Sequence, residues 1–192
     1  RSYSVTGVQT CALPIFHDNK AQYRNVAYKE TPTRIDFINP FFEALGWDVT
    51  NSGGLPEHQR EVVHEYTLGP EAPDYCFRIG RERKFFVEAK KPSVDLANSN
   101  ASAFQLRHYA WNAKLPVSIL TDFEEFVVYD CNVRPKVNDR PDAALLLYFT
   151  YDQYPDVWDR IAEIFHRYAV RNGSLDTLDR KSTRLNSSHR IR

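Results

Sequence analysis

Apolar residues recur at helical spacing in three stretches of the chain. The first stretch opens on Thr31-Pro32, a capping residue followed by proline at the first helical position. Its apolar positions are Ile35, Ile38, Phe41, Phe42 and Leu45. Asn39-Pro40 interrupts this pattern, so we expect a second cap and a restart of the helix there. The same spacing predicts helices at about residues 99–114 and 155–171.

Runs rich in aromatic and β-branched residues lie between these helices and predict strands. They are residues 61–66, 74–79, 84–90, 117–121 and 126–129. We expect residues 47–49 to begin a further extended segment, and residues 145–148 to form either a short strand or a loop packed on the core. The three tryptophans are expected in the core: Trp47, Trp111 and Trp158. The order helix, strands, helix, strands, helix predicts an α/β fold of the α+β type, a mixed central sheet flanked by helices.

The two strands at residues 74–79 and 84–90 are expected to form a hairpin around a turn at residues 80–83. If this hairpin is symmetric about Arg81, Asp74 and Glu88 lie opposite each other. Directly opposed side chains have Cβ atoms roughly 4.5–5.5 Å apart. Two carboxylates at that separation repel each other unless one is protonated or a cation lies between them.

Alternation along the second strand places Glu88 and Lys90 on one face and Val87 and Ala89 on the other. The apolar face can enter a core while the polar face meets a substrate. Mg²⁺ prefers oxygen ligands and typically binds one or two carboxylates together with substrate phosphate. The pattern therefore suits a metal-dependent phosphodiesterase, with Lys90 holding the attacking water or stabilising the transition state. The alternative is a solvated strand edge with Asp74 as a turn residue.

The chain has 192 residues, enough for one domain with a core. Both ends, residues 1–15 and 181–192, resemble translated sequencing-adapter sequence of the kind found in metagenomic gene fragments, so we set them aside. A cleaved signal peptide is the alternative for the first of them. We expect a core domain at residues 16–150 and a C-terminal helix with a connector at residues 151–180.

Trimming the ends changes the charge balance. The whole chain has 25 basic and 25 acidic residues, and the two end segments carry five basic and no acidic residues, which leaves 20 against 25, a net charge of −5. A protein that binds nucleic acid by itself usually shows a basic surface, so DNA affinity is expected to come from another part of a larger protein.

Cys76 and Cys131 are expected to be free, buried thiols in a reducing cytoplasm. No apolar run reaches the roughly 20 residues of a membrane span.

Several sequence blocks occur together in a familiar order. The blocks are Glu30-Thr31-Pro32-Thr33-Arg34, Leu45-Gly46-Trp47, Ala72-Pro73-Asp74-Tyr75, Val87-Glu88-Ala89-Lys90-Lys91-Pro92, Gln105-Leu106-Arg107-His108-Tyr109 and Ile119-Leu120-Thr121-Asp122-Phe123. The chain resembles the N-terminal PD-(D/E)xK nuclease domain of type IIG restriction-modification enzymes, in which the nuclease is fused to an adenine-specific DNA methyltransferase. Residues 164–175 resemble the connector that follows this nuclease, and the chain ends where the methyltransferase would begin. The nuclease domain of type I restriction R subunits is a looser match.

The resemblance implies a restriction-endonuclease-like core and hydrolysis of double-stranded DNA with Mg²⁺, or Mn²⁺ in its place. It implies that Asp74 and Glu88 bind the metal, with the Ala89 carbonyl as a third ligand, and that Lys90 attends the attacking water. Glu30 matches an upstream helical acid that assists the metal or the fold in relatives. A solvated residue before the helix cap is the alternative for Glu30.

Gln105 and Tyr109 match a Gln-x-x-x-Tyr pattern that lies beside the metal site in similar nucleases. An (i, i+4) pair shares one helix face, so both side chains are candidates for contact with the substrate backbone. The alternative is Tyr109 in the core with Gln105 at its rim.

Three basic residues, Arg34, Lys91 and Arg107, are further candidates for phosphate contact. Lone basic residues near a site are more often solvated, and Arg34 has two other possible roles, an (i, i+4) surface pair with Glu30 or orientation of the site. One alternative for the whole chain remains open as well. A non-catalytic DNA-binding or assembly module with a nuclease-like fold would fit the net negative charge.

Overall fold

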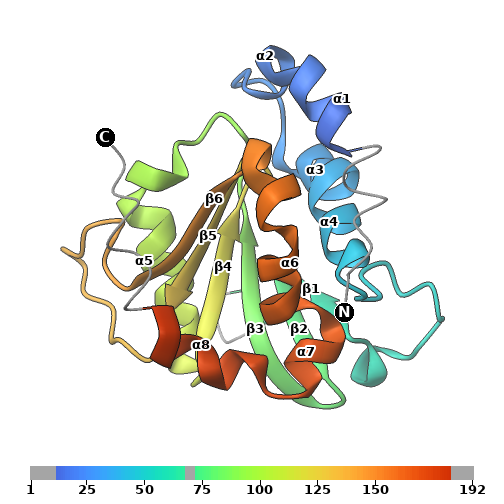
Figure 1. The fold of residues 1–192 in the computed structure, drawn as a ribbon, viewed down its shortest axis with the longest axis vertical. Helices are drawn as coiled ribbons and strands as arrows, with labels where there is room; N and C mark the ends of the chain where they lie inside the picture. Colours follow the sequence, from blue (N-terminus) through green and yellow to red (C-terminus); the bar gives the residue numbers. More distant parts are fainter. Residues whose placement is uncertain (1–11, 68–71, 183–192) are drawn as a thin grey trace.

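A six-stranded mixed sheet forms the centre of the structure, a computed structural model that describes residues 12–67 and 72–182 (Figure 1). The strands follow one another in the order β1-β2-β3-β4-β5-β6; β3 and β4 are parallel and all other neighbours are antiparallel. The predicted mixed sheet flanked by helices is therefore confirmed. The strands are β1 Val62–His64, β2 Tyr75–Ile79, β3 Glu82–Ala89, β4 Val117–Thr121, β5 Glu125–Asp130 and β6 Leu145–Thr150.

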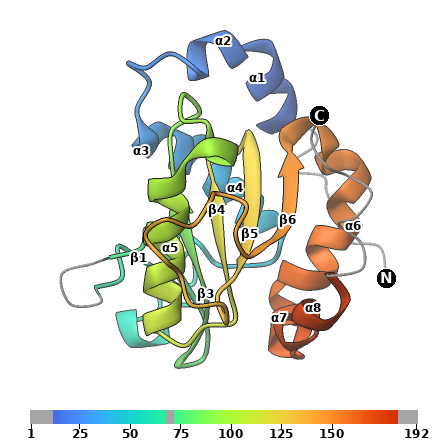
Figure 2. The same cartoon turned by 90° about the vertical axis from the view of Figure 1, so that its left-hand side faces the viewer.

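Helices cover both faces of this sheet. Figure 2 shows α5 on one face and the helices α6 to α8 on the opposite side of the molecule. The α-helices are α1 Leu13–Asp18, α2 Lys20–Tyr23, α3 Glu30–Thr33, α4 Asn39–Ala44, α5 Asn100–Asn112, α6 Tyr154–Phe165, α7 Arg167–Arg171 and α8 Ser174–Ser182. Shorter turns are the π-helical η2 Arg34–Ile38 and the 3₁₀ segments η3 Glu57–Gln59, η4 Leu96–Asn98 and η5 Tyr151–Gln153.

Two hydrophobic cores lie on the two faces of the sheet because successive strand residues alternate sides. The larger core joins α4 and α6 to the sheet and is rich in aromatic rings. At its centre Phe77 and Phe85 of neighbouring strands stack with ring centroids 4.5 Å apart. The smaller core lies under α5 and contains Cys76, Phe86 and Leu106. Cys76 and Cys131 are both buried free thiols, as expected.

The helices differ from the prediction in three places. The first helix begins at Glu30, so the predicted capping residue Thr31 lies inside α3. The first predicted helix does not restart at Asn39-Pro40; it continues from α3 through the π-helical η2 into α4. The last predicted helix divides at His166, whose backbone is extended (φ −58°, ψ 136°).

Residues 145–150 form strand β6, whereas residues 47–49 form no strand. The prediction that Trp111 lies in the core is wrong, because its side chain is 37% exposed on α5.

The described part of the N-terminal segment packs against the ends of the strands. Ala12 and Leu13 are buried beside Phe16 in the larger core. The carboxylate of Glu124, 7% exposed at the β4–β5 turn, accepts salt bridges from Lys20 at 2.7 Å and from Arg24 at 2.6 Å. The adapter interpretation of residues 1–11 and 183–192 concerns positions outside the described residues.

Across residues 12–67 and 72–182, every helix is too short or too polar to cross a membrane.

Candidate active site

The register of the β2–β3 hairpin sets the geometry of the site. Near its open end the pairs keep the predicted symmetry about Arg81, which places Asp74 opposite Glu88 just beyond the last paired residues. A β-bulge after Phe77 shifts the register by one residue toward the turn, so the turn itself is only Gly80-Arg81. The pairs on either side of the bulge are Tyr75 with Val87, Cys76 with Phe86, Phe77 with Phe85, Arg78 with Arg83, and Ile79 with Glu82.

The side chain of Asp74 is tied to the neighbouring strand β3, next to Glu88, by a backbone hydrogen bond. The Ala89 N–H donates to Oδ2 of Asp74 at 2.7 Å. The side chains of Asp74 and Glu88 both point to the face that carries Cys76 and Phe86, because residues two apart on a strand share a face. The hairpin therefore holds two carboxylates together on the α5 side of the sheet.

Glu88 is the most unusual side chain of the site. It is only 4% exposed, at a position of β3 that pairs with Leu120 of the neighbouring strand β4 inside the sheet. Its Oε1 accepts a hydrogen bond from Nζ of Lys90 at 2.7 Å, but its Oε2 is buried with no hydrogen-bond partner among the described residues. Burial, and after it the charge of Asp74, raise the pKa of Glu88 above its usual value.

Lys90 is the cation of this carboxylate. Its side chain is 20% exposed, so the ammonium reaches the surface while pairing with Glu88. Burial works to lower the pKa of Lys90, but the hydrogen bond to Glu88 and the nearby charges of Glu88, Glu30 and Asp74 outweigh it, and the pKa is raised. The ammonium is therefore held protonated beside the pair of carboxylates.

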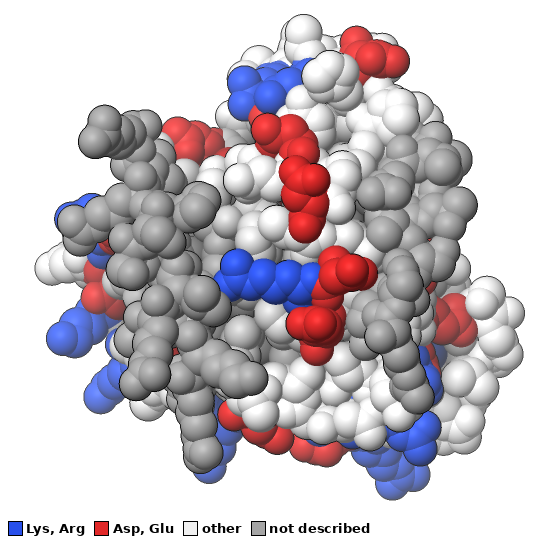
Figure 3. All heavy atoms as spheres, viewed as in Figure 1, with Lys and Arg blue, Asp and Glu red and all other residues white. Residues whose placement is uncertain are grey.

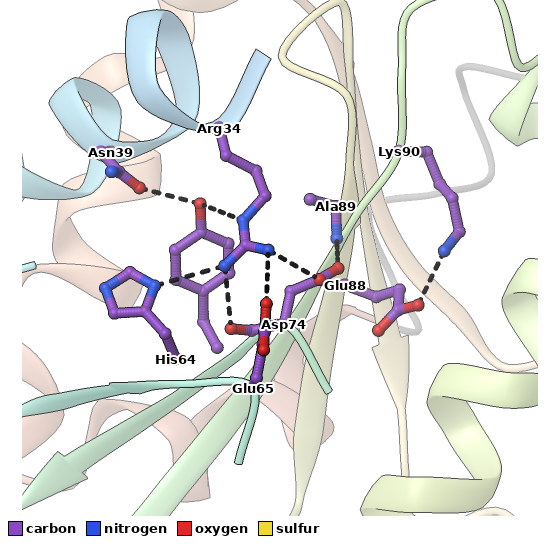
Figure 4. A network of polar contacts seen from close by, with 9 residues as sticks. Arg34, Asn39, His64, Glu65, Asp74, Glu88, Ala89 and Lys90 are labelled. Atoms are coloured by element: carbon purple, nitrogen blue, oxygen red, sulfur yellow. Dashed lines mark hydrogen bonds and ion pairs between the residues drawn. The ribbon is translucent and has the colours of Figure 1, made fainter. Parts of the chain in front are cut away.

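Arg34 is the cation of the other carboxylate (Figure 4). Its guanidinium donates to Oδ1 of Asp74 at 3.2 Å and to the Asp74 carbonyl at 3.4 Å. It also donates to the hydroxyl of Tyr75 at 3.3 Å and to Nδ1 of His64 at 3.3 Å. Glu65 lies 3.9 Å away. Of the roles considered for Arg34, orientation of the site fits these contacts, and the surface pair with Glu30 is not among its contacts in the described residues.

Glu30 lies close to the same group of charges. Burial, and then the charge of Asp74, raise the pKa of Glu30, while Lys90, Arg34 and Lys91 work to lower it. Glu30 is the first residue of α3. Lys91 does not point freely to solvent, because its ammonium donates to the Val26 carbonyl at 2.9 Å.

The candidate residues on α5 lie in different surroundings. Gln105 donates to the hydroxyl of Tyr109 at 2.6 Å, and Tyr109 is 7% exposed in the smaller core, the core on the face of Glu88. Arg107 requires a correction. It is 1% exposed, and its guanidinium binds Asp139 at 2.8 Å, so it is a buried structural residue and not a surface contact for phosphate.

Sequence reasoning missed the residues that hold Arg34. Tyr75 follows the predicted metal ligand directly, and its hydroxyl donates to Asn39 at 2.8 Å. His64, which shows no metal-ligand spacing in the sequence, receives the guanidinium N–H and contacts the Val49 carbonyl through its other ring nitrogen at 2.9 Å. An adjacent Asp-Tyr pair was the only sequence signal for this network.

The donor set fits a hard divalent cation. Oε2 of Glu88 is an unpartnered buried oxygen beside a second carboxylate, and a carboxylate offers about four lone-pair positions. No group of three or more His, Cys, Asp or Glu side chains within the described residues is arranged to share a metal ion. A cation at this place would therefore rely on two carboxylates, backbone oxygen and water, which is how Mg²⁺ is usually bound.

Comparison with known proteins shows which proteins the chain is similar to. No protein-family model matches the chain. Over 160 residues, the chain is 40% identical to the type II restriction enzyme and methyltransferase RM.Eco57I of Escherichia coli; the match covers 80% of this chain and 16% of that protein. A solved structure of the type IIG restriction endonuclease BpuSI matches with a TM-score of 0.44 and 16% identity, covering 76% of this chain and 17% of that one. The resemblance to fused restriction-modification enzymes is thus confirmed by a sequence relative, of which this chain spans a small part.

Proposed function

Because the chain is similar over most of its length to part of a type II restriction enzyme and methyltransferase, we propose that it is a metal-dependent DNA endonuclease domain of a restriction-modification enzyme. Its reaction is hydrolysis of a phosphodiester in double-stranded DNA. Asp74, Glu88 and Lys90 are its catalytic residues. Its partners are a methyltransferase and a target-recognition part in a longer parent chain.

The observation that carries this proposal is the environment of Glu88. A buried carboxylate with one oxygen unpartnered is costly, and the cost rises when a second carboxylate lies beside it. Among the described residues, Lys90 forms an ion pair with Glu88, and Arg34 forms one with the neighbouring Asp74. A site that keeps such an arrangement is suited to a cation supplied from solution, since the oxygen then gains a ligand.

Asp74 and Glu88 would hold the metal, with the Ala89 carbonyl and Glu30 as further candidate ligands. When bound, Mg²⁺ or Mn²⁺ supplies water activation and neutralises phosphoryl charge. Lys90 has three N–H donors and gives one to Glu88, so the others remain for the attacking water or a phosphoryl oxygen. Gln105 and Tyr109, on the helix that covers the same face, are candidates for the substrate backbone.

The charge distribution bears on how DNA is held. Figure 3 shows the face of the molecule covered by α6, where acidic side chains gather around a basic one. The exposed charged residues at positions 152–163 are Asp152, Asp156, Asp159, Arg160 and Glu163, four acids and one base. Phosphate would be repelled from this face, so DNA is expected on the opposite α5 side, with most of the affinity coming from other parts of the parent protein.

Plasmid nicking by the purified 192-residue chain tests the proposal. We expect weak nicking without sequence preference that needs Mg²⁺ or Mn²⁺ and stops with EDTA. Asp74→Asn, Glu88→Gln and Lys90→Met should each abolish it while circular dichroism stays native. The chain supplies a matched control on the same strand, because Glu82 and Lys84 form an equally spaced Glu-x-Lys pair at 2.9 Å, with side chains 73% and 23% exposed.

Glu82→Gln and Lys84→Met should leave nicking unchanged. Cleavage that survives Lys90→Met or Glu88→Gln, or a chain that nicks with no divalent metal, would overturn the assignment.

A non-catalytic DNA-binding or assembly module is the second candidate, favoured by the net charge of −5 over residues 16–180. Thermal melting separates the two. A metal that binds only the native state raises the melting temperature by linkage, and an inert module would melt at one temperature with or without millimolar Mg²⁺ or Ca²⁺.

A further inference from the structure

The helix that carries Arg34 is wider than an α-helix at the turn that faces Asp74. Residues Arg34–Ile38 form a single π-helical turn, in which the N–H of Asn39 donates to the carbonyl of Arg34. Pro40 explains the widening, because proline has no N–H and its ring clashes with the carbonyl four residues earlier, which here belongs to Asp36. Single π-turns inside helices frequently mark functional sites.

The side chain of Arg34 is held by Tyr75 and His64 besides Asp74. The guanidinium lies over the ring of Tyr75, 4.8 Å from its centroid, and donates to the hydroxyl of the same residue. That hydroxyl donates to Asn39, on the π-turn itself. A guanidinium can only donate, so His64 must accept at Nδ1, which leaves Nε2–H to donate to the Val49 carbonyl.

From this network we infer that Arg34 is a positioning residue, which holds the Asp74 carboxylate in the one orientation that turns it toward Glu88. The inference deepens the proposed function and rests on it. One oxygen of Asp74 accepts from Arg34 and the other from the Ala89 N–H, so the carboxylate is fixed at both ends. Each oxygen keeps a further lone pair for a cation.

An electrostatic role and a positioning role of Arg34 predict opposite changes in metal affinity when its side chain is removed. As a mere positive charge, Arg34 repels a divalent cation, and its removal would tighten metal binding. As the group that orients a metal ligand, its removal loosens binding, and such supporting partners typically change metal affinity by about 10–100-fold. The sign of the change in affinity therefore decides between the two roles.

Titration of the 192-residue chain with Mn²⁺ alone, followed by the paramagnetic signal of free Mn²⁺, measures this sign. We expect Arg34→Met to raise the Mn²⁺ dissociation constant at least about tenfold. Arg34→Lys keeps the charge but cannot reach Asp74, Tyr75 and His64 together, so it should bind nearly as weakly. Low-millimolar guanidinium should partly restore Mn²⁺ affinity to an Arg34→Ala variant, and equal sodium chloride should not. A purely structural role of Arg34 would not produce this rescue.

Two further variants keep the experiment decisive. Arg140→Lys is the matched control, since Arg140 pairs with Asp142 at 3.2 Å but is 82% exposed, and it should bind Mn²⁺ like the unmodified chain. Tyr75→Phe keeps the ring and removes only the hydroxyl, so it should weaken Mn²⁺ binding several-fold even if Arg34→Met fails to fold.

Unchanged or tighter Mn²⁺ binding in Arg34→Lys and Tyr75→Phe would overturn the role of Arg34. Glu88→Gln distinguishes this outcome from a failure of the proposed function. If Glu88→Gln abolishes Mn²⁺ binding while the Arg34 and Tyr75 variants bind normally, the metal site stands and the positioning role falls. If Glu88→Gln leaves Mn²⁺ binding intact, the proposed metal site itself is wrong.

Discussion

Replacing Glu88 by glutamine should stabilise the metal-free protein at neutral pH. The carboxylate is 4% exposed, its Oε2 lacks a partner among the described residues, and Asp74 repels it. Glutamine has nearly the same shape, keeps an acceptor for Lys90 and removes the buried negative charge. It also offers an N–H₂ group that can donate toward Asp74.

The size of the effect follows from two opposing contributions. Leaving a buried polar atom unpaired costs about 1–3 kcal/mol, and more when the group is charged. Weakening the ion pair with Lys90, whose side chain is 20% exposed, costs about 0.2–1 kcal/mol of folding stability. We therefore expect a net gain of about 1 kcal/mol, or roughly 2–4 °C in melting temperature for a chain of this size.

The gain should depend on pH. Because burial and Asp74 raise the pKa of Glu88 in the folded state above its usual value of 4.5, the folded chain binds this proton more tightly than the unfolded chain does. The stability contributed by Glu88 is fully present below the unfolded pKa and is lost as pH rises through the folded pKa. Glutamine imitates the protonated form, so its advantage should be seen at neutral pH and vanish in acid.

Differential scanning calorimetry in EDTA at neutral and acid pH, with Glu82→Gln as the exposed control, measures both features. Repeating the scans with Mg²⁺ should raise the melting temperature of the unmodified chain and of Glu82→Gln but not of Glu88→Gln, since a ligand stabilises the state that binds it. A Glu88→Gln protein that melts lower than the unmodified chain by the same amount at both pH values would refute the reasoning. Glu88 would then be a structural partner of Lys90 and not a site that awaits a cation.

Three further outcomes check the packing. Phe77→Ala should cost about 3–5 kcal/mol in urea unfolding, because the ring is fully buried and stacked on its neighbour in β3. Glu124→Gln should cost about 1 kcal/mol by thermal melting, since its buried carboxylate loses two basic partners, while the exposed Asp142→Asn should stay within about 0.5 kcal/mol. Cys76 and Cys131 should resist thiol reagents until the protein unfolds, because burial raises the pKa of each to about 12.

The hairpin could be predicted from the sequence because its information is local. Strand propensity, a glycine at the turn and alternation placed Asp74 opposite Glu88, and the β-bulge near the turn changed the register only on the side away from them. The π-turn could not be predicted in this way. A proline after a helical run is usually a sign of an interruption, and only packing against the sheet decides that the helix continues through a wider turn.

Single charged residues were the least predictable part of the site. Arg34 and Arg107 look alike in the sequence, one in each of two helices near the motif. The fold turns Arg34 toward Asp74 and buries Arg107 against Asp139 from the loop before β6, at a sequence distance of 32 residues. Such partners depend on tertiary contacts and not on spacing, which is why the local pattern brought Asp74 and Glu88 together but did not predict the burial of Arg107.

The two cations of the site are suited to different tasks because of how they are held. The guanidinium of Arg34 has its donors directed at the oxygens of Asp74 and Tyr75 and at the ring of His64, which leaves it little freedom to follow a moving group. The ammonium of Lys90 has one hydrogen bond among the described contacts and two donors to spare. A fixed fork is what a metal ligand needs to stay oriented, whereas a compact, rotatable ammonium can follow charge as it develops on a phosphoryl group. Exchanging the two chemistries should therefore fail in both directions, with lysine at position 34 losing metal affinity and arginine at position 90 losing turnover while the metal still binds.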